Sequence, residues 1–280
     1  MTGVGSVQGV RATVPGFVDI KAGERKLRIE YAWIAAEDHL APLLVFLHEG
    51  LGSVSMWKDY PRVLCMATGM RGLIYSRPGH GRSTPRAPDE RWPVAFMHRE
   101  AHVVLPALLD ALLVNTPVWL FGHSDGASIA LLFAAAFPAR THGIVVVAPH
   151  IMVEPLSIAS IEAARAQYAA GGLKARLARY HDDPDSAFHG WNDVWRDPAF
   201  HSWSIKSELD HIASPVLAVQ GTDDEYGTMA QIDGIAARVP HTRLVRLAQA
   251  GHSPHRDQPA KLTATVAAFM RAHGVHNSGC

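Results

Sequence analysis

Short runs of apolar residues alternate along this chain with segments whose apolar positions recur at helical spacing. Strands that are buried on both faces of a parallel sheet have few polar positions, so the uninterrupted runs predict strands of such a sheet. They cover residues 43–48, 72–76, 117–122, 144–149, 215–221 and 243–250. Helices are predicted between them, at residues 94–113, 125–137, 228–238 and 259–272. Alternation of this kind is typical of an α/β fold with helices on both faces of a mostly parallel sheet.

Two parts of the chain depart from this alternation. Residues 12–20 and 26–35 predict an antiparallel hairpin at the edge of the sheet. Residues 151–210 contain helix-forming segments and an aromatic cluster but no evident strand, and they are too long for an ordinary loop. We therefore expect a core of residues 1–150 and 211–280, with residues 151–210 inserted as a helical cap, or lid.

Composition narrows the class of protein. The chain of 280 residues has 26 basic (Lys+Arg) and 26 acidic (Asp+Glu) residues, so nothing indicates a surface for nucleic acid. The N-terminus lacks a basic segment followed by an apolar run, and no apolar stretch is long enough to span a membrane. Cys65 and Cys280 are too few for a disulfide framework, and no His or Cys spacing indicates a metal site. We expect a soluble, cytoplasmic protein.

The sequence Gly122-His123-Ser124-Asp125-Gly126 fits the pattern G-x-S-x-G. It follows a predicted strand and opens an Ala-rich helix, which is the setting of a nucleophile elbow. A serine hydroxyl there projects above the carboxyl edge of the sheet, where open α/β sheets bind ligands. The alternative is that Ser124 only caps the helix. A nucleophilic serine needs a base that is itself oriented by an acid, and His123 and Asp125 cannot serve because adjacent side chains diverge on a tight turn.

Two later strand ends supply candidates for the acid and the base. One strand ends at Gly221 and delivers Asp223 and Asp224 to the sheet edge, and the next ends at Gly251 and presents His252. A nucleophile followed by an Asp and then a His is the chain order of α/β hydrolases. Because of these motifs and their order, the chain resembles the α/β-hydrolase fold superfamily over nearly its whole length.

The resemblance selects among these residues. In that superfamily the acid usually stands three residues after the glycine that ends its strand, which favours Asp224 over Asp223. The histidine usually follows a glycine and stands seven residues before a proline, which favours His252 over His255. Asp223 is then expected to cap a turn and His255 to face solvent on its loop. Glu154, after an earlier strand, is a lesser alternative for the acid.

The resemblance also implies an oxyanion hole made by the backbone N–H groups of Gly50 and Asp125. Here the chain departs from the superfamily's pattern, because Glu49 stands where glycine is usual. A carboxylate that pointed inward would oppose the developing negative charge. We therefore expect Glu49 to turn away to a basic partner, either Arg77 or Arg82.

Several neighbouring residues have less direct roles in this interpretation. His48 and His123 are expected to be hydrogen-bonding scaffold residues rather than acid–base catalysts. Aromatic residues of the expected cap are candidates for an apolar substrate pocket, the alternative being that they pack the cap onto the core. With Glu49, the candidates for this pocket are Trp191, Trp195, Phe200 and Trp203.

Together these features predict a serine hydrolase that cleaves an ester, lactone or thioester through an acyl-enzyme, without a metal or organic cofactor. The expected partner is a small, partly apolar acyl substrate, and a homodimer is left open. The same scaffold also carries cofactor-free haloperoxidases, dioxygenases, lyases and carbon–carbon bond hydrolases, so these remain alternatives. A third class is a non-catalytic ligand receptor, which the presence of all three triad residues disfavours.

Overall fold

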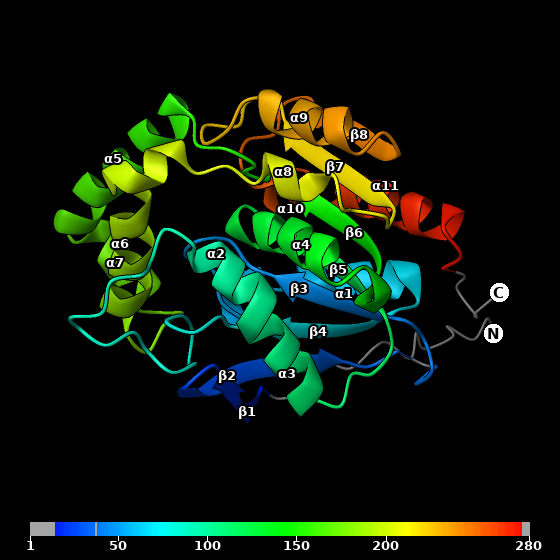
Figure 1. Ribbon diagram of the computed structural model, residues 1–280, viewed down its shortest axis with the longest axis horizontal. Coiled ribbons are helices and arrows are strands. Elements are labelled where there is room, and N and C mark those ends of the chain that lie inside the picture. Colours follow the sequence, from blue (N-terminus) through cyan, green and yellow to red (C-terminus); the bar gives the residue numbers. More distant parts are fainter. Residues whose placement is uncertain (1–14, 37, 276–280) are drawn as a thin grey trace, which may run out of the picture.

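The computed structural model describes residues 15–36 and 38–275. Its centre is an eight-stranded sheet in the order β1-β2-β4-β3-β5-β6-β7-β8 (Figure 1). The strands are β1 (Gly16–Ala22), β2 (Arg25–Ile34), β3 (Leu43–Leu47), β4 (Arg71–Tyr75), β5 (Val118–His123), β6 (Thr141–Val147), β7 (Val216–Gly221) and β8 (Thr242–Leu247). Strand β2 is antiparallel to both of its neighbours, and the other neighbouring pairs are parallel. The predicted strands are confirmed, as is the edge hairpin, although residues 12–14 of that prediction lie outside the described residues.

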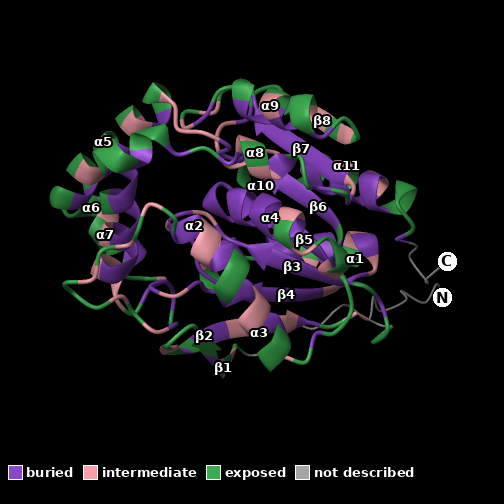
Figure 2. Ribbon diagram, in the orientation of Figure 1, coloured by how far each residue is buried: buried purple, intermediate pink, exposed green. Residues whose placement is uncertain are grey.

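Strand β3 shows why its apolar run is uninterrupted. Leu43, Val45 and Leu47 point into one hydrophobic core, while Leu44 and Phe46 point into a second core across the sheet. A strand that is covered on both faces has no solvent-facing positions, so every residue of β3 is buried (Figure 2).

Helices cover the two faces of the sheet. The helix α4 (Asp125–Ala136) lies on one face, and α1 (Tyr60–Thr68) packs beside α11 (Pro259–Ala272) on the other. Helix α9 (Ala230–Arg238) packs on β7 and β8. The sequence pattern predicted α4, α9 and α11 but missed α1, which ends at Gly69 in the left-handed region. Among the described helices, none is long and apolar enough to cross a membrane.

The predicted helix at 94–113 is not a single regular helix. It begins as α2 (Phe96–Arg99), widens to a π-helical turn at Glu100–Val104, and continues as α3 (Leu105–Ala111). The expected kink site, Pro106, lies directly after this turn, and a proline has no N–H to donate to the preceding turn.

Residues 151–210, the segment expected to form a cap and called the cap insertion below, contain four α-helices. They form α5 (Pro155–Ala169), α6 (Gly172–Leu177), α7 (Pro184–Trp195), a short turn at Pro198–Ser202 and α8 (Lys206–Leu209). Figure 1 shows α5, α6 and α7 together beyond the carboxyl ends of the parallel strands, on the left of the view. The last helix, α8, instead packs against α4 and α9 over the sheet.

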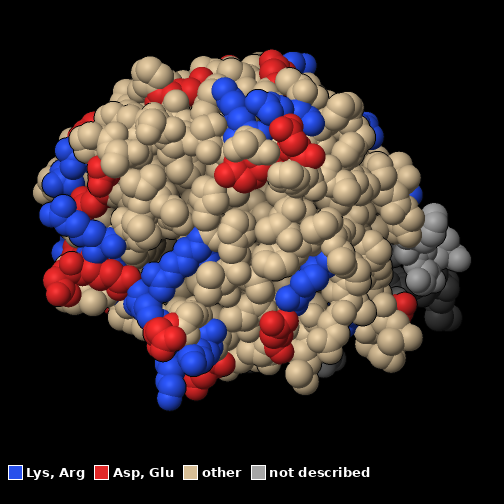
Figure 3. Space-filling view, viewed as in Figure 1, with Lys and Arg blue, Asp and Glu red and all other residues tan. Residues whose placement is uncertain are grey.

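Many charged side chains form ion pairs at the surface. On the face drawn in Figure 3, basic and acidic side chains lie next to one another rather than in a patch of one sign. Ion pairs such as Arg165–Asp193 at 3.0 Å and Lys174–Asp185 at 2.7 Å account for part of this pattern within the cap insertion.

Candidate active site

Ser124 lies on the sharp turn between β5 and α4 with a φ of 54°, which is unusual for a residue with a side chain. The turn requires glycine on both sides. A Cβ atom at Gly122 would lie 2.3 Å from the Gly126 carbonyl oxygen, and one at Gly126 would lie 2.1 Å from the Leu47 carbonyl oxygen. The Ser124 side chain makes no capping hydrogen bond to α4, so the helix-cap alternative does not hold.

The structure brings Ser124, His252 and Asp224 together from three loops at the same edge of the sheet. The Nε2 atom of His252 lies 2.9 Å from the Ser124 Oγ, and its Nδ1 atom lies 2.9 Å and 3.1 Å from the two carboxylate oxygens of Asp224. Because a carboxylate accepts hydrogen bonds, Nδ1 carries the proton in this arrangement. Nε2 of the neutral ring is then free to accept the serine proton.

Asp224 is held in place by other donors besides His252. Its carboxylate accepts hydrogen bonds from the Gln220 side chain at 2.6 Å and from the Tyr226 backbone N–H at 2.8 Å. Burial would raise the pKa of Asp224, but the hydrogen bonds from His252 and the Tyr226 N–H lower this pKa below its ordinary value. The carboxyl group therefore remains ionised near neutral pH.

The competing acids lie elsewhere. Asp223 is exposed, and its carboxylate accepts only from the Thr222 hydroxyl, at 3.2 Å. Glu154 accepts hydrogen bonds from the backbone and hydroxyl of Thr228, at 3.0 Å and 2.6 Å, and from Gln231 at 2.6 Å, so it ties the start of α5 to the loop before α9. Neither carboxylate contacts His252.

The prediction that His255 faces solvent is wrong. Its side chain is buried, with the ring centre 5.2 Å from that of Trp57 and 5.5 Å from that of Tyr60. The short helix α10 (Pro254–Asp257) turns this imidazole inward against α1, which the sequence pattern did not reveal. His255 does not contact Ser124 and packs instead against the ring of His123, with 4.7 Å between ring centres.

Gly50 and Asp125 border the same cavity as Ser124. Gly50 is required by its neighbour, because a Cβ atom there would lie 2.1 Å from the Trp191 indole nitrogen. The Asp125 side chain points away into the protein, where its carboxylate lies 3.6 Å from the Arg77 guanidinium and accepts from the Trp195 indole at 3.3 Å. Burial raises the pKa of Asp125, and the charge of Arg77 opposes this rise.

Glu49 has a basic partner, but not either of those predicted. Its carboxylate lies 3.2 Å from the Arg256 guanidinium and 3.6 Å from Nδ1 of His123. Arg77 instead donates to the Glu49 backbone oxygen at 2.9 Å, and Arg82 lies 3.9 Å from Asp182. Arg256 becomes the partner of Glu49 through tertiary packing, because α10 brings it to the site from a distant part of the chain.

The charge state of Glu49 follows from these contacts. Burial would raise the pKa of its carboxyl group, but the imidazole of His123 and the charge of Arg256 lower this pKa well below its ordinary value. Glu49 is therefore an anion, and the Arg256 guanidinium balances its charge.

His123 and His48 make scaffold hydrogen bonds. The Nε2 atom of His123 lies 2.7 Å from the backbone oxygen of His252, and a carbonyl oxygen only accepts, so this nitrogen donates. His48 Nδ1 lies 2.7 Å from the Glu49 backbone oxygen, and its Nε2 accepts from the Arg77 N–H at 2.9 Å. The two imidazoles thus fix the backbone around the loops that carry Gly50 and His252.

The cavity at Ser124 has a volume of about 210 Å³. Its apolar wall comes from the cap insertion, through Ile161, Leu173, Leu177, Trp191 and Trp195. Of the predicted pocket residues, Glu49, Trp191 and Trp195 therefore line it. Trp203 and Phe200 do not; they stack on each other, with ring centres 5.2 Å apart, in the hydrophobic core beneath the insertion.

His150 is a lining residue that sequence reasoning missed. It follows the strand β6 and is therefore delivered to the carboxyl edge of the sheet, which is the signal that could have identified it. Burial lowers the pKa of its imidazole to about 3, so the ring is neutral at ordinary pH. Its Nδ1 atom is buried without a hydrogen-bond partner.

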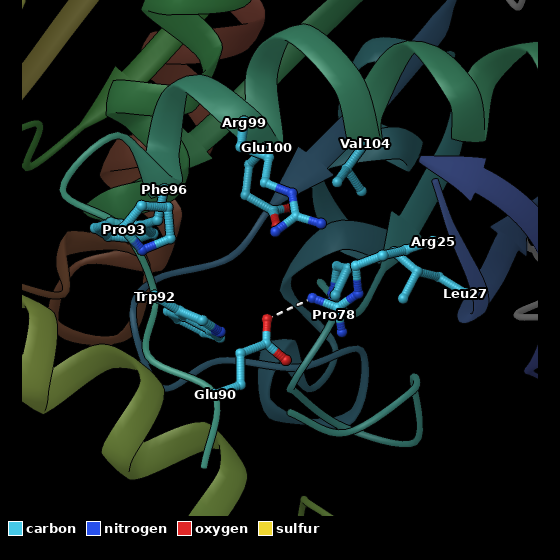
Figure 4. Close-up of a pocket in the computed structure, with 10 residues that line it drawn as sticks. All are labelled: Arg25, Leu27, Pro78, Glu90, Trp92, Pro93, Phe96, Arg99, Glu100 and Val104. Carbon is cyan, nitrogen blue, oxygen red and sulfur yellow. Dashed lines mark hydrogen bonds and ion pairs between the residues drawn. The ribbon is translucent and has the colours of Figure 1, made fainter. Parts of the chain in front are cut away.

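A separate cavity of about 30 Å³ lies between β2 and the π-helical turn (Figure 4). Glu90 and Arg25 form an ion pair at its rim. Glu100 also lines it, and burial raises the pKa of this carboxyl to about 7. Within the described residues, no group of three or more His, Cys, Asp or Glu side chains is arranged to hold a metal ion.

Comparison with known proteins shows the family of the chain. The model of the alpha/beta hydrolase family matches residues 44–266. A protein of Pseudomonas savastanoi pv. phaseolicola that is named as the carbamate hydrolase RutD is 27% identical over 254 residues, covering 83% of this chain and 95% of the relative. A pimeloyl-[acyl-carrier protein] methyl ester esterase of Aromatoleum aromaticum is 24% identical over 268 residues, covering 82% and 98%.

The solved structures agree in fold. The enol-lactonase of Burkholderia xenovorans LB400 superposes with a TM-score of 0.65 at 20% identity, over 88% of this chain and 97% of that one. With an elbow serine, a mostly parallel sheet and a family match over most of its length, the chain belongs to the alpha/beta hydrolase family.

Proposed function

We propose that this protein is a serine hydrolase that cleaves an ester, lactone or thioester through an acyl-enzyme intermediate. The observation that carries the proposal is the continuous chain of hydrogen bonds from Asp224 through His252 to Ser124, which opens into a cavity. Relatives named as a carbamate hydrolase and a methyl ester esterase support it, because both names denote hydrolysis of a carbonyl compound.

In the proposed reaction, the Ser124 Oγ attacks the substrate carbonyl while His252 Nε2 takes the serine proton. The ionised Asp224 stabilises the resulting imidazolium. Backbone N–H groups of Gly50 and Asp125 bind the developing oxyanion, and the start of α4 adds the positive end of its dipole. His252 then returns the proton to the leaving group. A water molecule cleaves the acyl-enzyme by the same steps and releases the acid.

Glu49 has a positioning role in this proposal. Its carboxylate faces His123, and His123 in turn donates to the backbone oxygen of His252. The carboxylate also pairs with Arg256 on α10, which directly follows the loop of the catalytic base, and so ties that loop to the loop of Gly50. Because the Arg256 guanidinium balances its charge, Glu49 does not oppose the oxyanion in this proposal.

Labelling with a fluorophosphonate probe tests the proposal. The probe should modify Ser124, as identified by mass spectrometry of the labelled peptide, and the protein should release nitrophenol from 4-nitrophenyl acetate. The Ser124→Ala variant should lose both reactions, while the neighbouring Ser128→Ala variant should keep them, because the Ser128 hydroxyl is bonded to the backbone oxygen of His150 at 2.6 Å. Equal turnover by wild type and Ser124→Ala contradicts the mechanism.

A further inference from the structure

A groove of about 480 Å³ lies directly beside the catalytic cavity. Met56 and Arg256 line both the groove and the cavity, so the two spaces are contiguous. The groove runs over the loop that follows β3 and the start of α1, and its walls are largely apolar. These walls come from Trp57, Tyr60, Val63 and Pro259.

Basic side chains gather at the rim of this groove around Tyr180. Lys58 and Arg256 line the groove itself, and the Lys58 ammonium donates to the Tyr180 hydroxyl at 2.8 Å. The Arg179 guanidinium lies 5.8 Å from the centre of the Tyr180 ring. The hydrogen bond from Lys58, with the charges of Arg179 and Arg256, lowers the pKa of the Tyr180 hydroxyl.

The nearby carboxylates already have partners. Asp59 receives two hydrogen bonds from Arg62, at 2.7 Å and 2.5 Å, and Asp182 faces Arg82. Across residues 15–36 and 38–275, neither Lys58 nor Arg179 forms an ion pair with a carboxylate. Arg256 pairs with Glu49 at 3.2 Å, so the uncompensated positive charge at the rim comes from Lys58 and Arg179.

The backbone holds Lys58 in place. Its φ of 55° and ψ of −133° lie in a region that side chains rarely adopt. Strain of this kind persists only where the surroundings determine the conformation. Lys58 follows the turn at Ser55–Trp57, and its exposed side chain places the ammonium against the Tyr180 hydroxyl at the rim.

We propose that this groove binds the leaving group of the substrate, and that the leaving group carries an anion, a carboxylate or a phosphate, which Lys58 and Arg179 recognise. The inference rests on the proposed hydrolase function. His252 must deliver its proton to the leaving group, and Arg256 follows His252 on the adjoining helix α10. The acyl group then occupies the apolar wall of the cap insertion on the other side of Ser124.

Matched substrates test the inference. The butyryl ester of 3-(4-hydroxyphenyl)propanoate is compared with that of the corresponding amide, which has the same shape and no charge. The butyryl ester of 2-(4-hydroxyphenyl)ethyl phosphate forms the phosphate arm. Each hydrolysis adds water across the ester bond and gives butyrate and a phenol. We expect kcat/KM to be about fivefold higher for the charged ester in low salt, and the difference to shrink as salt screens the charges.

Substitutions at the rim distinguish an effect of the positive charges from an effect of the groove's shape. Lys58→Met and Arg179→Met should each reduce the ratio of charged to neutral kcat/KM, and the double variant Lys58→Glu/Arg179→Glu should reverse it. Tyr180→Phe removes the hydrogen bond to Lys58 but leaves every cation, so it should keep the ratio above one. Lys26→Met, at the start of the distant strand β2, is the matched control for loss of one surface lysine.

The outcomes distinguish this inference from the proposed function. Hydrolysis that depends on Ser124 but shows no preference for a charged leaving group overturns the inference and leaves the hydrolase proposal standing. A preference for monophenyl glutarate over its amide, without one on the leaving-group side, places the anion on the acyl group and also overturns it. Absence of any Ser124-dependent hydrolysis across the series contradicts the proposed function itself.

Discussion

The Nε2 atom of His252 lies 2.9 Å from the Oγ atom of Ser124, although 128 residues separate the two along the chain. Each residue stands in a loop at the carboxyl edge of the sheet, Ser124 after β5 and His252 after β8. The parallel strands therefore deliver both side chains to one edge. Asp224, in the loop after β7, joins them by its contact with His252.

Replacing Asp224 by Asn should reduce kcat by about 10⁴-fold, because Asn can no longer hold the His252 ring with its proton on Nδ1. The measurement is steady-state hydrolysis of an activated acyl ester. Asp223→Asn is the control, since its exposed carboxylate touches only Thr222 and should change the rate less than about threefold. A large loss in the Asp223 variant, with little in the Asp224 variant, contradicts the assignment of the acid.

Replacing Glu49 by Gln should lower kcat by about tenfold with little change in KM. The variant loses the carboxylate that faces His123, and with it the support of the loop at His252. Glu49→Asp keeps the charge and should recover part of the rate. NMR of ¹⁵N-labelled imidazoles gives an independent signature, because the His123 resonances should shift in the Gln variant. A rise in kcat instead means that the native carboxylate opposes the oxyanion.

Replacing Trp191 by Ala should shift acyl preference toward larger groups by about tenfold in kcat/KM. The indole lines the cavity and covers Gly50, so its removal enlarges the acyl side of the site. A series of 4-nitrophenyl esters from acetate to decanoate measures the shift. Trp203→Phe is the matched control, because Trp203 does not line the cavity, and it should leave the preference unchanged. An unaltered chain-length profile in the Trp191 variant places the acyl group elsewhere.

Replacing Glu100 by Gln should stabilise the protein at alkaline pH. The pKa of Glu100 is raised from 4.5 to about 7 on folding, mainly by burial, so the folded state holds a proton that the unfolded state releases between these values. Stability is thus fully present below about pH 4.5 and falls as the pH rises to about 7. The gain in the free energy of unfolding should be about 3 kcal/mol at pH 8 and near zero at pH 4.

Urea unfolding of the wild type and the Glu100→Gln variant at these two pH values measures the difference. Glu24→Gln, on the exposed turn between β1 and β2, controls for loss of one carboxylate. Equal stabilisation by the Glu100→Gln substitution at both pH values contradicts an ionisation effect and points to packing instead.

The sequence determined the fold and placed the elbow and its two partners on strand ends. Uninterrupted apolar runs indicate strands that are buried on both faces of the sheet. The order of these strands along the chain also indicates which loops carry the serine, the acid and the histidine. The tight turn at Ser124 requires the glycines on both sides of it, and the sequence pattern also predicted this requirement. The sequence pattern did not predict helix α1 or the π-helical turn before Pro106. In these two segments tertiary packing, rather than the local spacing of apolar residues, determines the backbone.

Which side chains meet around this framework depends on tertiary packing. Arg256, rather than Arg77 or Arg82, faces Glu49, because α10 crosses the site from the far end of the chain. His255 turns inward instead of facing solvent, and Trp203 packs in the core instead of lining the pocket. Side-chain partners are set by the approach of elements distant in sequence, and no local spacing records that approach.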